Sequence, residues 1–259
     1  MSARVSVGVS LKMYFGHAEA RRWFARVAEL AAGHPAVASG AVECFVIPTY
    51  LQVLPAVEAF VDTPVVVGAQ DVATEDSGPF TGEVSARELA EVGVRLAEVG
   101  HAERRRLFGE TEAVVAKKTA AALRNGLTPV LCLGEIERVE ATDAAAEVVR
   151  QLHTALDGAP GGRVMVAYEP VWAIGAQEPA PVEHIAAVAR ALRAAVDALP
   201  GGDGSTVIYG GSAGPGLLAA LDGAVDGLFL GRFAHDPAAL ATVLDEAGAL
   251  AALRQEVRA

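Results

Sequence analysis

An acidic residue directly follows an apolar, β-prone stretch: Glu169 comes after Val-Met-Val-Ala-Tyr at residues 164–168. A continuous apolar run is typical of a parallel strand that is covered on both faces. A carboxylate at the end of such a strand can act on a ligand, and Trp172 and Ile174 supply apolar mass that can close over it and exclude water. A carboxylate paired with an arginine at the rim is the alternative interpretation of an isolated Glu-Pro pair.

Two more ionisable residues occupy similar positions. His101 ends an apolar stretch and directly precedes a charged segment, although a lone histidine is more often structural. Lys12 follows the first apolar run, and lysine supplies only three of the 21 basic residues. Proton abstraction next to a carbonyl group needs a base, an electrophile and a positive charge around one small anion. Glu169, His101 and Lys12 offer that set.

Strand-like and helix-like segments that could position these residues alternate along the whole chain. Eight apolar runs begin near Val5, Val42, Val65, Val94, Val130, Val164, Val207 and Leu228. Ala-rich amphipathic stretches lie between them, for example at residues 17–32, 112–124, 142–156, 181–199 and 237–253. Eight repeats of about 32 residues favour a closed (β/α)₈ barrel, an α/β fold with a single domain over residues 1–259, over a doubly wound sheet.

In such a barrel, chemistry is found where the strands end and the following loops begin. The unusual residues fall at these places. They are Lys12 after the first strand, Gln70 and Asp71 after the third, His101 and Glu103 after the fourth, Glu169 after the sixth, residues 209–212 after the seventh, and Gly231 and Arg232 after the eighth. Functional groups that come from different strands and meet at one end of the barrel are hard to explain as unrelated surface residues.

Composition narrows the class of protein. The net charge of −11 argues against nucleic-acid binding, which requires a clustered basic face. No apolar run approaches the roughly 18–20 residues of a membrane span, and no signal-like segment opens the chain. We therefore expect a soluble, cytoplasmic protein. Cys44 and Cys132 lie in apolar runs, which predicts buried thiols rather than a disulfide. We expect neither a metal, because no His/Cys ligand cluster is present, nor an organic cofactor, because no dinucleotide-binding glycine motif is present.

Several motifs together are far more specific than any one residue. They are Leu11-Lys12-Met13, Phe80-Thr81-Gly82-Glu83, Gly100-His101-Ala102-Glu103-Arg104-Arg105, Phe108-Gly109-Glu110-Thr111, Cys132-Leu133-Gly134-Glu135, residues 167–175 (AYEPVWAIG) and Tyr209-Gly210-Gly211-Ser212. On these motifs the chain resembles the triosephosphate isomerase family over essentially its whole length. The resemblance implies an isomerase that moves the carbonyl group of a small phosphorylated sugar without a cofactor.

The resemblance also implies a role for each matching residue. Glu169 corresponds to the general base and His101 to the neutral electrophile, a pair of roles that is itself a standard example of tuned acid–base chemistry. Lys12 corresponds to the cation that stabilises the enediolate, and Glu103 to the carboxylate that holds Lys12 in place. The positions that correspond to phosphate-binding residues are Gly175, Ser212, Gly231 and Arg232.

Two loops follow from the same resemblance. Residues 170–180, which we call the lid, correspond to a mobile segment that closes over the ligand; they include Pro170, Val171, Trp172, Ala176 and Gln177. Closure matters because an exposed enediolate phosphate loses phosphate instead of isomerising. Phe80, Thr81 and Gly82 resemble a loop that reaches the active site of a neighbouring subunit, which implies a homodimer.

The chain departs from the family pattern near the expected substrate. Ser10 and Leu11 replace the usual asparagine and tryptophan, Ala102 replaces a serine, residues 176–179 differ from the usual Thr-Gly-Lys, and Arg232 replaces a glycine. Ser10 is expected to open volume beside Lys12, enough for one more hydroxymethyl group. Arg232 can bind phosphate or extra hydroxyl groups, or point to solvent.

Ser10 and the Gly231-Arg232 pair resemble a branch of the family that converts L-erythrulose 1-phosphate into D-erythrulose 4-phosphate in the catabolism of erythritol and threitol. This substrate is dihydroxyacetone phosphate with a hydroxymethyl group added on the carbon that loses its proton. Ordinary triosephosphate isomerase activity, as in glycolysis, is the alternative. A catalytically silent phosphate-binding barrel is a third hypothesis, because a fold does not fix a function.

Overall fold

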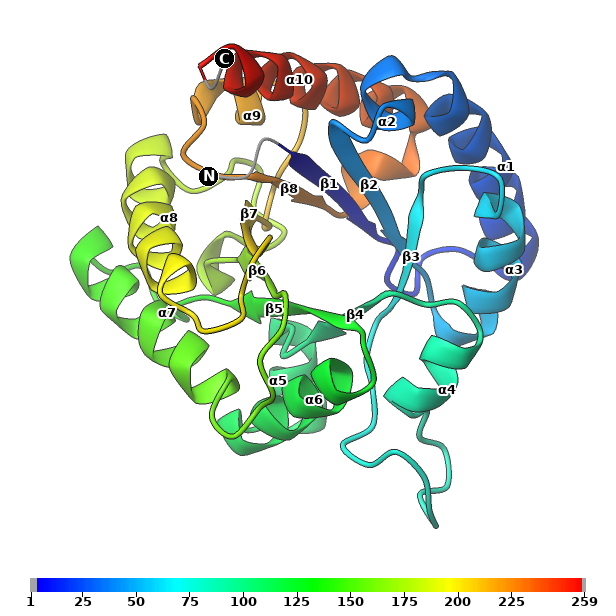
Figure 1. The fold of residues 1–259 in the computed structure, drawn as a ribbon. Coiled ribbons are helices and arrows are strands. Elements are labelled where there is room, and N and C mark those ends of the chain that lie inside the picture. The colour runs from blue at the N-terminus through cyan, green and yellow to red at the C-terminus, as the bar shows by residue number, and fades with distance from the viewer. Residues whose placement is uncertain (1–3, 258–259) are drawn as a thin grey trace.

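Eight parallel strands close into a barrel in which β8 pairs back with β1 (Figure 1). The computed structural model describes residues 4–257. The strands are β1 (Val5–Ser10), β2 (Val42–Ile47), β3 (Val66–Ala69), β4 (Leu96–Val99), β5 (Thr128–Leu133), β6 (Met165–Tyr168), β7 (Thr206–Tyr209) and β8 (Gly227–Leu230). No strand begins more than two residues from the apolar run that predicted it. The predicted (β/α)₈ barrel is confirmed.

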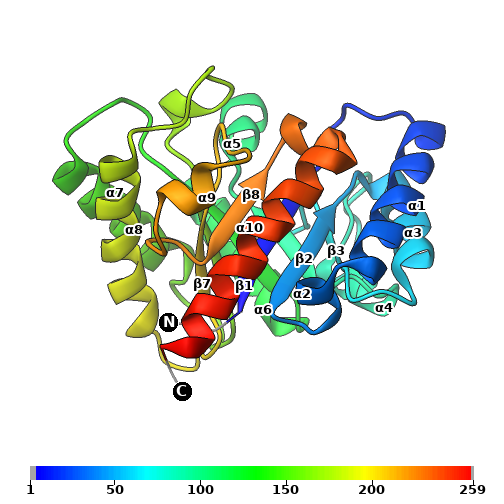
Figure 2. The same ribbon diagram turned by 90° about the horizontal axis from the view of Figure 1, so that it is seen from above.

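The helices lie around the outside of the barrel (Figures 1 and 2). They are α1 (His17–Gly33), α2 (Pro35–Ala38), α3 (Tyr50–Phe60), α4 (Ala86–Glu91), α5 (Ala102–Phe108), α6 (Glu112–Arg124), α7 (Ala141–Ala155), α8 (Val182–Asp197), α9 (Leu217–Ala220) and α10 (Pro237–Glu256), with short 3₁₀ turns η1 (Val171–Ala173) and η2 (Arg232–His235). The five amphipathic stretches match α1, α6, α7, α8 and α10. The sequence pattern did not indicate α3, where Pro55 falls inside the helix and obscures the helical periodicity.

Alternate residues of each strand point into the barrel or out toward the helices, as the two-residue period of a strand requires. The outward-facing side chains and the helices form one large apolar core. A smaller core fills the inside of the barrel and consists of Phe45, Ile47, Leu96, Val130, Cys132, Met165, Ala167, Ile208 and Phe229. Leu96 belongs to the inner core, whereas Ala97 and Val99 belong to the outer one. Glu98 therefore points into the barrel.

The side chains of the inner core fill the middle of the barrel. Phe45 lies against β1 at Gly8, where any Cβ atom would overlap the phenyl ring. The Phe45 ring stacks on the ring of Phe229 with 5.8 Å between their centroids. Because this layer is filled with side chains, a ligand site has room only at an end of the barrel.

A buried serine–glutamate pair, here called the lower pair, lies at the N-terminal ends of the strands. Ser6 of β1 faces Glu43 of β2 in register, and the Ser6 hydroxyl donates to Glu43 Oε2 at 3.1 Å. Arg163 forms a two-pronged ion pair with the same carboxylate, with Nη1 at 2.9 Å from Oε1, and Arg4 lies 3.7 Å away. Burial alone would raise the pKa of Glu43, but Arg163 lowers it below its usual value.

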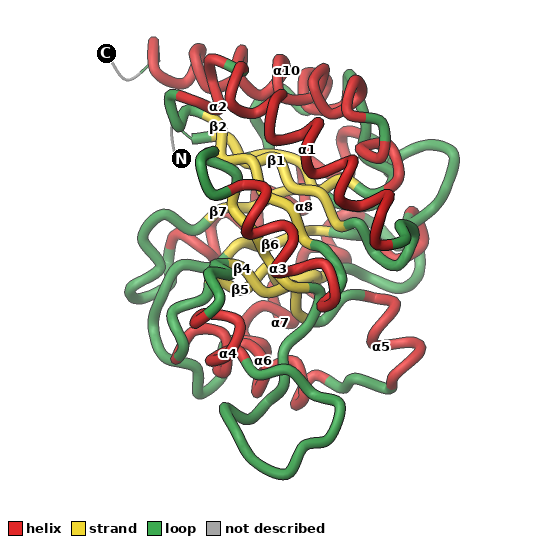
Figure 3. The backbone as a smooth tube through the Cα atoms, turned by 90° about the vertical axis from the view of Figure 1, so that its right-hand side faces the viewer, coloured by secondary structure: helices red, strands yellow, loops and turns green. Residues whose placement is uncertain are grey.

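The loop between β3 and α4 extends away from the barrel, while the other connections stay closer to it (Figures 1 and 3). Both cysteines are buried and free, as predicted. Burial raises the pKa of Cys44 to about 12, so this thiol stays protonated at neutral pH. No helix in residues 4–257 is long and apolar enough to cross a membrane.

Candidate active site

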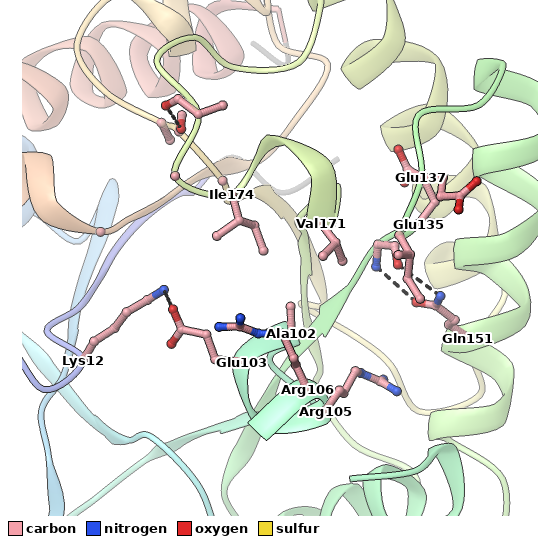
Figure 4. A pocket seen from close by; sticks show the side chains of 18 of the residues that line it. Lys12, Ala102, Glu103, Arg105, Arg106, Glu135, Glu137, Gln151, Val171 and Ile174 are labelled. Atoms are coloured by element: carbon pink, nitrogen blue, oxygen red, sulfur yellow. Dashed lines mark hydrogen bonds and ion pairs between the residues drawn. The ribbon is translucent and has the colours of Figure 1, made fainter. Parts of the chain in front are cut away.

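A cavity of about 1200 Å³ opens at the C-terminal ends of the strands. Its walls include Lys12, Ala102, Glu103, Arg106, Val171, Ile174, Gly175, Ala176, Gly211, Ser212, Gly231 and Arg232. The structure thus brings together the loops after β1, β4, β6, β7 and β8, as the barrel predicted. Val171 and Ile174 lie across the cavity from Lys12 and Glu103 (Figure 4). His101 and Glu169 are not part of the open wall, because they are only 5% and 6% exposed beside it.

Glu169 and His101 face each other beside this cavity. Glu169 Oε2 lies 3.6 Å from His101 Nε2, and it is buried without a hydrogen-bond partner among the described residues. The Glu169 backbone N–H donates to the Leu133 carbonyl at 2.8 Å, which fixes the start of the loop. Gly210 makes room for the carboxylate, because a Cβ there would overlap it. An unpartnered buried carboxylate oxygen is suited to accept a proton from a ligand.

The tautomer of His101 follows from its backbone contact. The Glu103 N–H donates to His101 Nδ1 at 3.1 Å, at the N-terminus of α5. Nδ1 is therefore an acceptor, and the proton of the neutral ring is on Nε2. Nε2 lies 3.6 Å from Glu169 Oε2, beyond hydrogen-bond distance, so Nε2–H can donate to a ligand oxygen that lies beside the two residues.

Lys12 is held in an unusual backbone conformation. Its φ angle is +45°, a left-handed value that is uncommon for a residue other than glycine. The Gln70 side chain donates to the Lys12 carbonyl at 3.0 Å and to the Ile47 carbonyl at 3.2 Å, which fixes the turn. Such strain persists only where the surroundings enforce it, often at functional sites. The turn directs Lys12 into the cavity wall.

The Lys12 ammonium group pairs with Glu103, with 2.7 Å between Nζ and Oε1 (Figure 4). Burial would lower the pKa of Lys12, but the bond and charge of Glu103 raise it above its usual value. Burial would likewise raise the pKa of Glu103, but Lys12 lowers it. Both groups are therefore charged at neutral pH, and the cavity carries a fixed cation.

A second buried serine–glutamate pair, here called the upper pair, lies beside His101 and was not predicted. Ser10 Oγ donates to Glu98 Oε2 at 3.0 Å, and Glu98 Oε1 is 4.0 Å from His101 Nε2. Burial raises the pKa of Glu98 to about 7, and the nearby charge of Glu169 adds to this rise. The space beside Ser10 thus holds a carboxyl group. The sequence does contain a signal for this pair, because Glu98 is an acidic residue at an inward-facing position of an otherwise apolar strand.

The lid is tied to the barrel by side chains at several points. Ser212 Oγ donates to the Ala176 carbonyl at 2.6 Å and to the Ala173 carbonyl at 3.2 Å. The N–H of Ala180 donates to the Tyr209 hydroxyl at 3.2 Å. At the other end, Trp172 Nε1 donates to the buried carboxylate of Glu135 at 2.8 Å. The lid therefore has hydrogen-bond partners on β7, in the loop after β7 and in the loop after β5. Ala176 and Gln177 of the lid are exposed.

The predicted phosphate-binding residues surround one part of the cavity. Gly175, Ser212, Gly231 and Arg232 all line it, and Gly175 has a left-handed φ of +74°. Arg232 is exposed, and its side chain has no hydrogen bond or ion pair within residues 4–257. Arg106 lines the same cavity. Two arginines and Lys12 give this wall cationic groups that suit an anion.

Asp71 does not join this site, although it follows β3. Lys118 Nζ lies 2.6 Å from Asp71 Oδ1, and Arg104 pairs with the same carboxylate at 2.8 Å. Glu110 completes this buried cluster behind the loop. Asp71 therefore anchors the start of the loop that carries Phe80, Thr81 and Gly82, which are all exposed. Within the described residues, no group of three or more His, Cys, Asp or Glu side chains could hold a metal.

Comparison with known proteins agrees with this geometry. A family profile described as Triosephosphate isomerase matches residues 5–247. The chain belongs to the triosephosphate isomerase family. It is 50% identical over 250 residues to the L-erythrulose-1-phosphate isomerase of Pectobacterium atrosepticum, covering 95% of this chain and 96% of that protein. It is 42% identical over 225 residues to the triosephosphate isomerase of Thermus thermophilus, covering 84% and 88%.

A solved structure extends the agreement to the fold. The crystal structure of triosephosphate isomerase from Bartonella henselae superposes with a TM-score of 0.78 at 26% identity, covering 94% of this chain and 98% of that chain. The family, its relatives and the barrel together identify an isomerase. Membership of this family suggests a small phosphorylated sugar as the substrate.

Proposed function

We propose that this enzyme interconverts L-erythrulose 1-phosphate and D-erythrulose 4-phosphate. The observation that supports the proposal most directly is the polar upper pair beside His101. A three-carbon ligand has no additional hydroxyl group to bind there, whereas the four-carbon ligand has one. The 50% identity to the Pectobacterium protein over 95% of this chain supports it. The 42% identity to the Thermus triosephosphate isomerase keeps the three-carbon reaction as the alternative outcome of the test.

The chemistry starts with Glu169. Its carboxylate takes the proton from C3 of the ketose, and the C–H electron pair forms the C2–C3 double bond of an enediolate. His101 Nε2–H donates to the oxygens on C2 and C3 and shuttles a proton between them, while Glu169 returns its proton to C2. The carbonyl group moves from C2 to C3, and no atom is gained or lost.

The remaining groups stabilise charge and exclude water. Lys12 faces the developing enediolate, and its partner Glu103 keeps the ammonium group in position. Gly175, Ser212, Gly231 and Arg232 bind the phosphate group. The lid, from Pro170 through Val171, Trp172, Ala176 and Gln177, covers the intermediate so that phosphate is not eliminated.

The direct test is a parallel assay of the purified protein on L-erythrulose 1-phosphate and D-glyceraldehyde 3-phosphate. We expect a higher kcat/KM for the tetrulose phosphate. An enzyme that turns over the triose phosphate near the diffusional limit and ignores the tetrulose phosphate would refute the proposal and leave triosephosphate isomerase. Exchange of solvent deuterium into the ketose distinguishes either enzyme from a barrel that only binds phosphate.

We also propose that two copies of the chain form a homodimer through the loop of Phe80, Thr81 and Gly82. Phe80 is 46% exposed at the end of the protruding loop, Met13 in the loop after β1 is 90% exposed, and Phe108 at the C-terminal end of α5 is 67% exposed. Exposed apolar side chains of this kind favour a protein interface. Sedimentation at micromolar concentration should give a dimer; a stable, fully active monomer would rule this out.

A further inference from the structure

The carboxyl group of Glu98 is in an unusual position for a barrel interior. It is 3% exposed and lies on the inward face of β4, which it shares with Leu96 of the inner core. Within the described residues its one hydrogen bond is to Ser10 Oγ, and no arginine or lysine lies within ion-pair distance. A buried carboxyl group with so little compensation is costly for folding. Such a group calls for a partner that the protein alone does not supply.

The position of Glu98 relative to His101 defines what that partner contacts. Glu98 Oε1 is 4.0 Å from His101 Nε2, and Glu169 Oε2 is 3.6 Å from the same nitrogen. A ligand held by Glu169 and His101 therefore lies next to Glu98. Ser10 is two residues before Lys12, and Glu98 is three residues before His101, so both lie deeper in the barrel than the residues that act on the ligand.

The direction of the substrate chain follows from its two ends. In the proposed function, the phosphate group binds to the lid and to the loops after β7 and β8, which bring Gly175, Ser212 and Gly231 to the cavity wall. The reacting carbons then lie beside Glu169 and His101. A carbon chain that continues past them runs away from the phosphate and into the barrel. In a triose phosphate the chain stops at the reacting carbons, whereas the tetrulose phosphate adds a hydroxymethyl group there.

We propose that Glu98, oriented by Ser10, binds the terminal hydroxyl group of the four-carbon substrate and so determines specificity. This inference rests on the proposed function and names the residues that recognise the additional carbon. A hydroxyl group both donates and accepts hydrogen bonds, and a carboxyl group that is protonated in part of the molecules can match either role. Ser10 supplies a second hydroxyl group beside the same carboxyl oxygen.

The Glu98→Leu variant tests the inference because it keeps the volume and removes the polar atoms. We expect kcat/KM for L-erythrulose 1-phosphate to fall about ten- to a hundredfold, as for loss of a hydrogen bond to a carboxyl group. Activity on D-glyceraldehyde 3-phosphate should stay within a few fold. Ser10→Ala should shift the ratio of the two activities in the same direction by less than tenfold.

A substrate analogue sharpens this test. In 4-deoxy-L-erythrulose 1-phosphate a methyl group replaces the terminal hydroxymethyl group, so the reacting atoms are unchanged. The wild-type enzyme should discriminate against this analogue about tenfold or more, and Glu98→Leu should discriminate little. Glu43→Gln in the lower pair is the matched control: it changes a buried glutamate of the same kind, and we expect the wild-type preference to persist.

The outcomes separate the inference from the proposed function. A wild-type enzyme without activity on the tetrulose phosphate overturns both. An active wild-type enzyme whose Glu98→Leu variant keeps the wild-type ratio, or loses both activities equally while folded, overturns the inference alone. If Glu98→Leu does not fold, the ratio of the two activities is measured on Ser10→Ala, which is a smaller change. A ratio equal to that of the wild type then overturns the inference.

Discussion

The two serine–glutamate pairs of the barrel consist of the same residue types on inward-facing positions, yet their surroundings differ. In the lower pair, Arg163 binds the Glu43 carboxylate with two nitrogens and lowers its pKa. In the upper pair, no arginine of residues 4–257 forms an ion pair with Glu98, and burial raises its pKa to about 7. The difference teaches that a buried charge stabilises the fold only where the chain provides its counter-ion. The N-terminal end of the barrel has this compensation, whereas the C-terminal end leaves polar groups available to a ligand.

The comparison predicts that changes at the C-terminal end affect activity more than stability. Lys12→Met should show this most strongly, because it keeps volume but removes the Lys12 ammonium group from the cavity wall. Loss of a preorganised group that stabilises an oxyanion costs on the order of a hundred- to a thousandfold, and we expect about a thousandfold or more in kcat/KM. Steady-state kinetics and thermal unfolding measure the two effects. A variant that stays active, or a protein that fails to fold, would break the comparison.

Glu169→Asp should have the next largest effect on activity. The change withdraws the carboxylate by one methylene, and an error of about 1 Å in positioning can cost on the order of a hundredfold in turnover. Binding of a phosphate-bearing enediolate analogue should stay within a few fold. Less than a tenfold loss of kcat would remove Glu169 from the role of base.

The pH dependence of stability separates the two glutamates directly. The pKa of Glu98 is raised from 4.5 to about 7 in the folded protein, so its ionisation destabilises the fold progressively as the pH rises through that range. Glu98→Gln should therefore gain stability relative to the wild type between pH 5 and pH 8, on the order of 2–3 kcal/mol. Denaturant unfolding at both pH values measures this gain.

Glu43→Gln should behave in the opposite way. The lowered pKa of Glu43 gives stability that is present above its unfolded value of 4.5 and is lost as the pH falls through the folded value. The variant should lose about 2 kcal/mol at both pH 5 and pH 8, because the carboxylate is ionised at both. Equal pH profiles for the two variants would contradict the difference between the pairs.

The barrel and the residues at the C-terminal ends of its strands could be predicted because their sequence signals are local. Eight apolar runs recur at a regular spacing, and Lys12, His101 and Glu169 each follow one of them. The upper pair could not be predicted, because Ser10 and Glu98 lie 88 positions apart and meet only when β1 and β4 close around the same interior. Asp71 shows the same limit: it follows a strand, but its partner Lys118 comes from α6 and draws it away from the cavity. Contacts across the barrel depend on closure, which no single segment encodes.

The smallest predicted effect concerns the residues that set substrate preference together with Glu98. Ser10→Asn places a larger amide beside Glu98, and Arg232→Gly removes a cation from the cavity wall. The double variant should shift preference toward D-glyceraldehyde 3-phosphate by about tenfold, because one packing or polar group is worth about 1–3 kcal/mol in discrimination. Both substrates have to be measured on both proteins, since specificity is a difference between two barriers.

The single variants separate the two contributions. Arg232→Gly should lower activity on both substrates alike if Arg232 binds only the phosphate, whereas Ser10→Asn should lower activity on the tetrulose phosphate alone. An equal loss on both substrates from Ser10→Asn would place the upper pair outside substrate recognition and make it, like the lower pair, a feature of the fold.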